Sequence, residues 1–140
     1  MTVASEFFPE KGLIISTFSG KVDSADLYCN FEVMPQDPRF HPDMDHLVDF
    51  SGVARVEVPT ETIRKVAEEY RVFSDQCRRI IVAPQDLAYG LCRMYEGYRD
   101  LPESRFFLFR TLPEAMAWLT QNPSPIWPPA DQDDKRVPAG

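Results

Sequence analysis

The chain has 140 residues, of which 44% are hydrophobic and 26% charged, so it is long enough for one globular domain with its own core. Its net charge of −7 at pH 7 disfavours nucleic acid and anionic membrane surfaces as partners, because both are negatively charged. No apolar run reaches the ~18–20 residues that span a bilayer, and the first residues lack a signal-peptide pattern. We therefore expect a cytoplasmic protein without an integral membrane segment.

The first third of the chain predicts a β-hairpin followed by a helix. Glu6–Pro9 and Leu13–Ser19 flank a turn at residues 10–12, and Gly20 is expected to end the second strand. Asp23 is a good N-cap residue, and the acidic residue three positions later resembles a capping box. The apolar residues Leu27, Phe31 and Met34 then recur at helical spacing. Pro35 and Pro38 are expected to end this helix.

The middle of the chain predicts two buried strands with a helix between them. Met44–Gly52 is an apolar run that ends at a Ser-Gly turn. Thr60 is expected to cap the following helix, and Arg79–Ala83 forms the next strand. The core stripe of that helix is predicted to be Ile63, Val66, Ala67, Tyr70 and Phe73.

The last third predicts a helix, a strand and a helix. Asp86–Leu101 is helical, with Leu87, Leu91, Met94, Tyr95 and Tyr98 on its apolar face. Arg105–Arg110 forms the strand, and Thr111 with Glu114 is a capping box that opens the final helix. The residues of that helix expected to face inward are Leu112, Ala115, Met116 and Leu119.

The resulting order, ββαβαβαβα, predicts a single α/β domain over residues 1–121, with helices covering a mixed sheet of four to five strands. Residues 122–140 are a Pro-rich C-terminal tail, a composition that is usually disordered. Ile126 and Trp127 carry the most apolar area in the tail, so we expect it to dock through Trp127.

Three segments carry a resemblance to a known family, together with the N-terminal hairpin. They are LVDFSGV (Leu47–Val53), RIIVAPQDLAYGLCRMYE (Arg79–Glu96) and RFFLFRTLPEAMAWL (Arg105–Leu119). Their order and spacing resemble the SpoIIAA-like, or STAS/SEC14-type, bacterial domains of uncharacterised function. The resemblance covers about residues 6–121 and implies a SpoIIAA-like fold.

The resemblance also implies two kinds of site. Anti-sigma-factor antagonists of this fold are phosphorylated on a serine at the start of the helix after the DLSG-like strand. Here the serine positions hold Val58 and Pro59, so the nearest hydroxyl is Thr60, and the candidate switch turn comprises Asp49, Ser51, Glu57 and Thr60. The SEC14 side implies a cavity between helices and sheet for a small apolar ligand or lipid, which we expect Tyr95, Tyr98, Phe107 and Phe109 to line.

The Asp86–Leu101 helix offers a candidate interaction surface. Tyr89, Arg93 and Glu96 fall on its outward side, and an exposed tyrosine beside an arginine is typical of contact surfaces. Gly90 and Gly97 lie seven residues apart, where another helix or a ligand could approach the backbone. With Trp127 of the tail, these residues are expected to bind a protein partner or to close a homodimer.

Other chemistries have weaker sequence signals. His41, Asp43, Asp45 and His46 carry metal-ligating groups, but a proline stiffens this loop and His46 adjoins the strand, so a polar loop leading into the sheet explains them better and we predict no metal site. The odd count of three cysteines predicts reduced thiols, and neither Cys77 nor Cys92 has a recognisable histidine partner. We therefore predict a non-catalytic regulatory or protein-interaction module without a cofactor, with a carrier or sensor of a small apolar ligand as the alternative.

Overall fold

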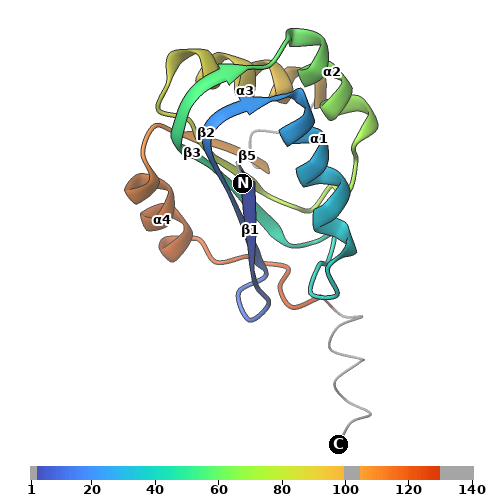
Figure 1. Cartoon of the computed structure of the whole chain (residues 1–140). Helices are drawn as coiled ribbons and strands as arrows, with labels where there is room; N and C mark the ends of the chain where they lie inside the picture. The colour runs from blue at the N-terminus through green and yellow to red at the C-terminus, as the bar shows by residue number, and fades with distance from the viewer. Residues whose placement is uncertain (1–2, 100–104, 130–140) are drawn as a thin grey trace, which may run out of the picture.

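Five strands form one mixed sheet, in the order β1-β2-β3-β4-β5, in the computed structural model, which describes residues 3–99 and 105–129 (Figure 1). The strands are β1 (Val3–Phe8), β2 (Leu13–Asp23), β3 (Asp45–Glu57), β4 (Arg79–Val82) and β5 (Phe106–Phe109). The helices are α1 (Ser24–Val33), the short 3₁₀ helix η1 (Met34–Gln36), α2 (Thr60–Glu69), α3 (Asp86–Arg99) and α4 (Leu112–Gln121). No helix among the described residues has the length and apolar character needed to cross a membrane.

Strand pairing follows from the lengths of the connections. β1 and β2 are joined by a tight turn and pair antiparallel, whereas β2–β3, β3–β4 and β4–β5 are parallel pairs. Each parallel pair is joined through a helix, as the crossover between parallel strands requires. The mixed sheet and the element order predicted from the sequence are both confirmed.

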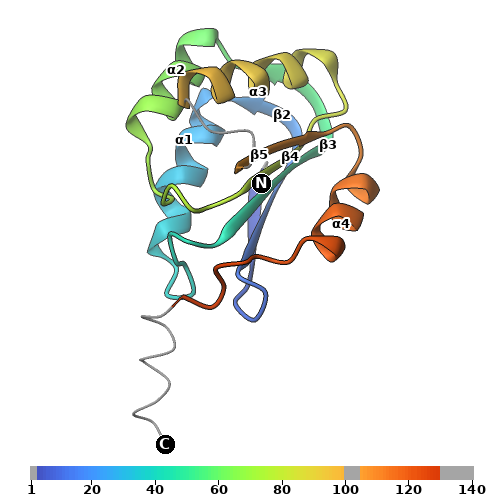
Figure 2. The ribbon, with the colours of Figure 1, turned by 180° about the vertical axis from the view of Figure 1, so that it is seen from behind.

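Helices cover the two faces of the sheet unequally. α1, α2 and α3 lie on one face, and α4 alone lies on the other (Figures 1 and 2). Alternation along each strand assigns the core residues, so Phe18 and Ile81 pack toward α1–α3 while Leu13 and Ile80 belong to the α4 side. The described residues therefore form an apolar layer on each face, and a third apolar cluster gathers around Ile14, Met44 and Phe73.

β2 and β3 run further than the sequence predicts. Gly20 was expected to end β2 and Ser51-Gly52 to end β3, but the two strands stay paired as far as Asp23 and Glu57. Their register shifts between Thr17 and Ser19 and again between Gly20 and Lys21. These shifts are β-bulges, which insert extra residues and bend the ribbon without breaking the pairing. The curved ends of both strands lie against the helices in Figure 1.

Two of the three predicted helix caps are confirmed. The Asp23 side chain accepts from the Asp26 backbone N–H at 3.1 Å, and Asp26 returns a bond to the Asp23 N–H at 2.9 Å. Thr111 Oγ1 accepts from the Glu114 N–H at 3.3 Å. The cap predicted at Thr60 is wrong, because Pro59 occupies the N-cap position and supplies no side-chain bond.

Several predicted boundaries and orientations are wrong. α2 ends at Glu69, so Phe73 is not part of its apolar stripe as predicted. Phe73 lies in the loop after the helix and is buried there. Leu87 and Tyr98 of α3 were predicted to face the core but are 58% and 40% exposed. The α3 residues buried in the apolar layer against the sheet are Ala88 and Leu91. Met116 of α4 is 39% exposed for the same reason, since one helix buries a narrow stripe. The predicted end of α3 at Leu101 lies outside the described residues.

The segment after α4 crosses the β1–β2 turn. The Trp127 indole N–H donates to the Pro9 carbonyl at 2.7 Å, and its ring meets His41 edge-on, with centroids 5.6 Å apart. Gly12, with φ of 62°, lies so close beneath the indole that no Cβ would fit. Trp127 is therefore docked on its own chain.

Replacing Gly12 by alanine is expected to cost more free energy of unfolding than replacing Gly20. Both glycines have positive φ, but a Cβ on Gly20 meets open space. Gly20→Ala should cost about 1 kcal/mol from backbone strain. Gly12→Ala should cost about 1–3 kcal/mol more, because the methyl group displaces Trp127. Urea unfolding measures both costs, and equal costs would contradict the packing at Gly12.

Candidate functional site

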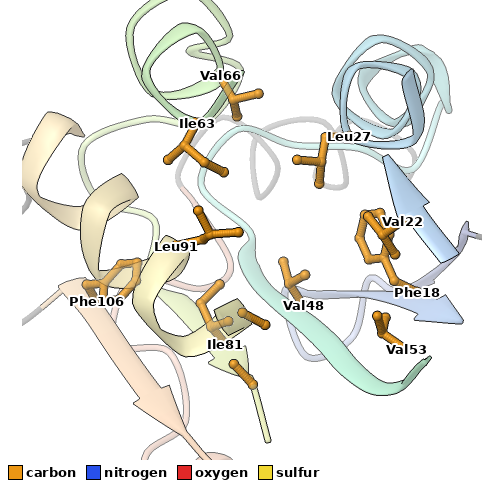
Figure 3. Close-up of a cluster of buried hydrophobic side chains, with 12 residues drawn as sticks. Phe18, Val22, Leu27, Val48, Val53, Ile63, Val66, Ile81, Leu91 and Phe106 are labelled. Atoms are coloured by element: carbon orange, nitrogen blue, oxygen red, sulfur yellow. The ribbon is translucent and has the colours of Figure 1, made fainter. Parts of the chain in front are cut away.

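An apolar cavity of about 90 Å³ lies between α1–α3 and the sheet. Figure 3 shows buried apolar side chains of α1, α2, α3 and the sheet pointing toward one another around this cavity. Phe18 and Val48 come from β2 and β3, Ile63 from α2, and Leu91 from α3. The curved end of the β2–β3 ribbon contributes Val22, Phe50 and Val56 to its wall.

The cavity wall offers no charge to a ligand. None of the described lining residues is charged, and its one amide side chain, Asn30, is already bonded. Asn30 Oδ1 accepts from Ser5 Oγ at 3.1 Å and from Ser16 Oγ at 3.3 Å. Burial also raises the pKa of the lining Cys92 thiol to about 12, so that thiol is neutral. A cavity of this kind selects apolar molecules.

A buried polar network lies beside the cavity on the same face of the sheet. Ser16 Oγ and His46 Nε2 are 2.8 Å apart, and the His46 ring stacks on Phe73 with centroids separated by 4.9 Å. Burial, with a smaller effect from the charge on Arg79, lowers the pKa of His46 to about 3. His46 is therefore neutral at physiological pH, and its hydrogen bond to Ser16 joins β3 to β2 inside the core.

Of the residues predicted to line a cavity, Tyr95 does so. Tyr98 is 40% exposed, and Phe107 and Phe109 pack against Trp118 of α4 on the opposite face, with ring centroids 4.2 and 6.2 Å away. The neighbouring β5 residue Phe106 takes their place in the cavity wall. Successive residues of a strand point to opposite faces, so the assignment depends on which helices cover each face.

A cluster on the outer side of α3 brings three predicted residues together. Arg93 Nη1 pairs with Glu96 Oε1 at 2.9 Å, and Arg93 Nη2 donates to Tyr89 Oη at 3.4 Å. Two further members of this cluster, Asp86 and Arg110, were not predicted from the sequence. The Arg110 guanidinium lies 3.9 Å from the Tyr89 ring centroid and 2.9 Å from Asp86 Oδ1. Parallel pairing of β4 and β5 places Arg110 beside the start of α3, and strand order was the signal that could have found it.

The other predicted interaction residues are not part of that cluster. Gly90 and Gly97 are exposed, and apart from their chain neighbours and the backbone of α3 itself, no described atom lies within 4 Å of where their Cβ atoms would be. Trp127 packs on the β1–β2 turn, away from α3. We define the α3 patch as Asp86, Tyr89, Arg93, Glu96 and Arg110.

The residues of the predicted switch turn are spread along the β3 strand and do not converge. Asp49 is buried on the α4 side and accepts from the Ser51 N–H at 2.9 Å, which closes the β-bulge. Glu57 lies at the far end of β3 and pairs with Arg55 at 2.7 Å. Thr60 is exposed at the start of α2, beyond Glu57, and the strand from Asp49 to Glu57 alone is about 25 Å of chain.

The described parts of the chain contain no cluster of side chains suited to metal binding, and the buried thiols are unreactive. Residues 3–99 and 105–129 hold no group of three or more His, Cys, Asp or Glu side chains that could bind a metal ion. Asp45 is paired with Arg78, whereas the adjacent His46 points to the other face of the sheet. Burial raises the pKa of the Cys77 thiol to about 12, so it is protonated.

Comparison with known proteins gives the fold. No protein-family model matches the sequence, and no curated protein matches it either. An uncharacterised protein of the DUF3478 family from Shewanella loihica PV-4, with a SpoIIAA-like fold, is similar in structure, with a TM-score of 0.53 and 15% sequence identity. The match covers 84% of this chain and 91% of that chain. The fold of this protein is therefore SpoIIAA-like, as predicted from the sequence.

Proposed function

We propose that this protein is a non-catalytic binding module that holds a small apolar molecule in the cavity between α1–α3 and the sheet. The observation that carries the proposal is the cavity itself, about 90 Å³ in a wall without charged residues. Close-packed cores leave few voids larger than a water molecule, and an apolar cavity of this order takes up small apolar ligands. Of the two roles considered from the sequence, the geometry favours the carrier or sensor.

The state of the reactive side chains supports a role in binding. The Cys77 and Cys92 thiols are protonated because burial raises their pKa values. Ser16 is fully buried beside a neutral His46, so neither can reach a substrate in solution. A carrier needs none of these groups to react, because its affinity comes from apolar area removed from water.

Benzene is the direct probe of the cavity, and methyl NMR reports where it binds. Saturable shifts are expected for Val48, Ile81 and Leu91, which surround the cavity, and not for Leu47 or Ile80 on the α4 face. Shifts spread over both faces, or none at all, would refute the proposal. Native mass spectrometry of protein purified from its own host then identifies the natural occupant.

Ala88→Leu is expected to abolish benzene binding, because Ala88 lines the cavity and the larger side chain fills it. The fold should survive with a change in unfolding free energy of about 1 kcal/mol or less, since the added carbons occupy existing space. Ala117→Leu makes the same change at an exposed position of α4 and should leave benzene binding intact. Equal binding by both variants would contradict the assigned site.

A second candidate function, protein interaction, is favoured by the α3 patch. An arginine stacked on a tyrosine, with two further charged pairs around it, is typical of contact surfaces. A double variant, Tyr89→Ala with Arg93→Ala, is expected to weaken self-association or partner binding measured by analytical ultracentrifugation and affinity capture. Arg64→Ala, on the exposed side of α2, is the control and should change neither.

A further inference from the structure

The outward face of α3 combines two opposite charges, a glycine and apolar side chains. Asp86, Gly90 and Arg93 are spaced four and three residues apart, so they follow one another along one side of the helix. Leu87 and Met94 run beside them and are also seven residues, or nearly two turns, apart. α3 lies on the outside of the molecule, over the sheet (Figure 2). We define these five residues as the α3 stripe.

The side chains of the α3 stripe are open to a partner. Leu87 is 58% exposed, more than a core-facing leucine would be. The Asp86 and Arg93 side chains are 97% and 55% exposed, although each already has one ion pair, with Arg110 and Glu96 respectively. Since a carboxylate and a guanidinium can each accept or donate several hydrogen bonds, both can take a second partner of opposite charge.

Gly90 packs against no other part of the described chain. Its backbone is helical, and apart from its chain neighbours and the backbone of α3, no described atom lies within 4 Å of where its Cβ would be. A glycine within a helix is less favourable than an alanine, and no turn or internal contact requires it here. The distance between two packed helices depends on the side chains at their contact, so the missing side chain lets another helix approach closely.

The α3 stripe is complementary to itself when two copies of α3 pack antiparallel. A two-fold axis beside Gly90 places Asp86 of each copy opposite Arg93 of the other, because these residues lie four positions before and three positions after Gly90. The same register places Leu87 opposite Met94 of the other copy. Parallel packing would instead bring like charges together, so the charges select the antiparallel arrangement.

We propose that the α3 stripe binds a second copy of this chain, with the two α3 helices antiparallel about a two-fold axis at Gly90. This inference rests on the second candidate function, protein interaction through α3, and names its partner. A two-fold interface uses the same surface on both subunits, as the α3 stripe does. One helix per subunit makes a small contact, so the dimer is weak and forms at high protein concentration.

Charge reversal followed by analytical ultracentrifugation tests the register. The full-length protein is measured from about 10 µM to about 1 mM, the range in which small interfaces dissociate. Asp86→Arg and Arg93→Asp are each expected to weaken self-association about tenfold or more, because both symmetric ion pairs become repulsive. An equimolar mixture of these two variants should recover the native affinity. In the mixed dimer, the introduced arginine faces the introduced aspartate and the native Asp86 faces the native Arg93.

Gly90→Leu tests the close approach of the two helices. The variant should keep its fold, because the added side chain meets open space and leucine favours helix. It should weaken self-association about tenfold or more, because the leucine holds the helices apart. Ala117→Leu, at an exposed position of α4, is the control and should associate like the native protein.

Three results would each overturn the inference. They are a native protein that stays monomeric at 1 mM, a mixture of the charge variants that associates no better than either alone, and a Gly90→Leu variant as dimeric as the native protein. If Tyr89→Ala with Arg93→Ala still weakens capture of a different protein, the second candidate function stands without this dimer. Gly90→Leu should leave benzene binding unchanged, since Gly90 does not line the apolar cavity.

Discussion

Arg78→Met is expected to lower the free energy of unfolding by about 3–5 kcal/mol, the largest effect of any single change considered for this protein. The Arg78 and Asp45 side chains are only 8% and 4% exposed, so removing the guanidinium leaves a buried carboxylate without a counter-charge. It also removes the bond to the Asn122 carbonyl. Urea unfolding measures the loss, and the indole N–H NMR signal of Trp127, assigned separately from that of Trp118, reports whether its segment stays docked.

Arg64→Met is the matched control for Arg78→Met. Arg64 pairs with Glu61 and Glu68 on the exposed side of α2, where water screens the charges, so the same substitution should cost far less free energy of unfolding. Combining Arg78→Met with Asp45→Asn should cost less than the sum of the two single changes, because neither charge is then left alone. Additive losses, or equal costs at Arg64 and Arg78, would contradict the buried pair.

Acidification from pH 7 to pH 5 is expected to reduce stability by about 2 kcal/mol through His46 alone. Burial lowers the pKa of His46 from its ordinary 6.5 to about 3 in the folded protein. The unfolded chain therefore takes up a proton as the pH falls through 6.5, while the folded protein does not until about pH 3. The contribution of His46 is complete above pH 6.5 and declines between these two values.

His46→Gln isolates this contribution, because glutamine does not titrate and its amide can replace the bond to Ser16. The difference in unfolding free energy between the native protein and the variant should shrink as the pH falls from 7 to 5. In the native protein, the imidazole NMR signals of His46 should stay constant from pH 7 to pH 4. Parallel stability curves, or a His46 titration near pH 6, would show that the ring is accessible to protons.

Local sequence patterns predicted the elements of this fold well, because their causes lie within a few residues. Asp23 with Asp26 and Thr111 with Glu114 start α1 and α4 through bonds three residues apart. The apolar runs of β3 and β4 identify buried strands by composition alone. The order of these elements predicted the α/β sheet, and the resemblance of three segments to known domains implied its SpoIIAA-like type.

The sites were predicted less well, because they depend on contacts between distant residues. Gly20 and Ser51-Gly52 look like strand ends, but pairing between β2 and β3 continues through two bulges that cross-strand hydrogen bonds hold in place. Phe106 and Phe107 have the same local sequence character, and only the positions of α3 and α4 decide which of them lines the cavity.

The sequence by itself thus determined the type and order of the helices and strands and the caps of α1 and α4, because propensity and capping act within one or two turns of chain. Only the tertiary structure decided three contacts: the ion pair of Arg78 with Asp45, the packing of Trp127 on Gly12, and the stacking of Arg110 on Tyr89. Each of these contacts joins residues more than 20 positions apart, and each exists because the sheet brings their strands or loops together. The apolar cavity between α1–α3 and the sheet is likewise a product of that long-range packing.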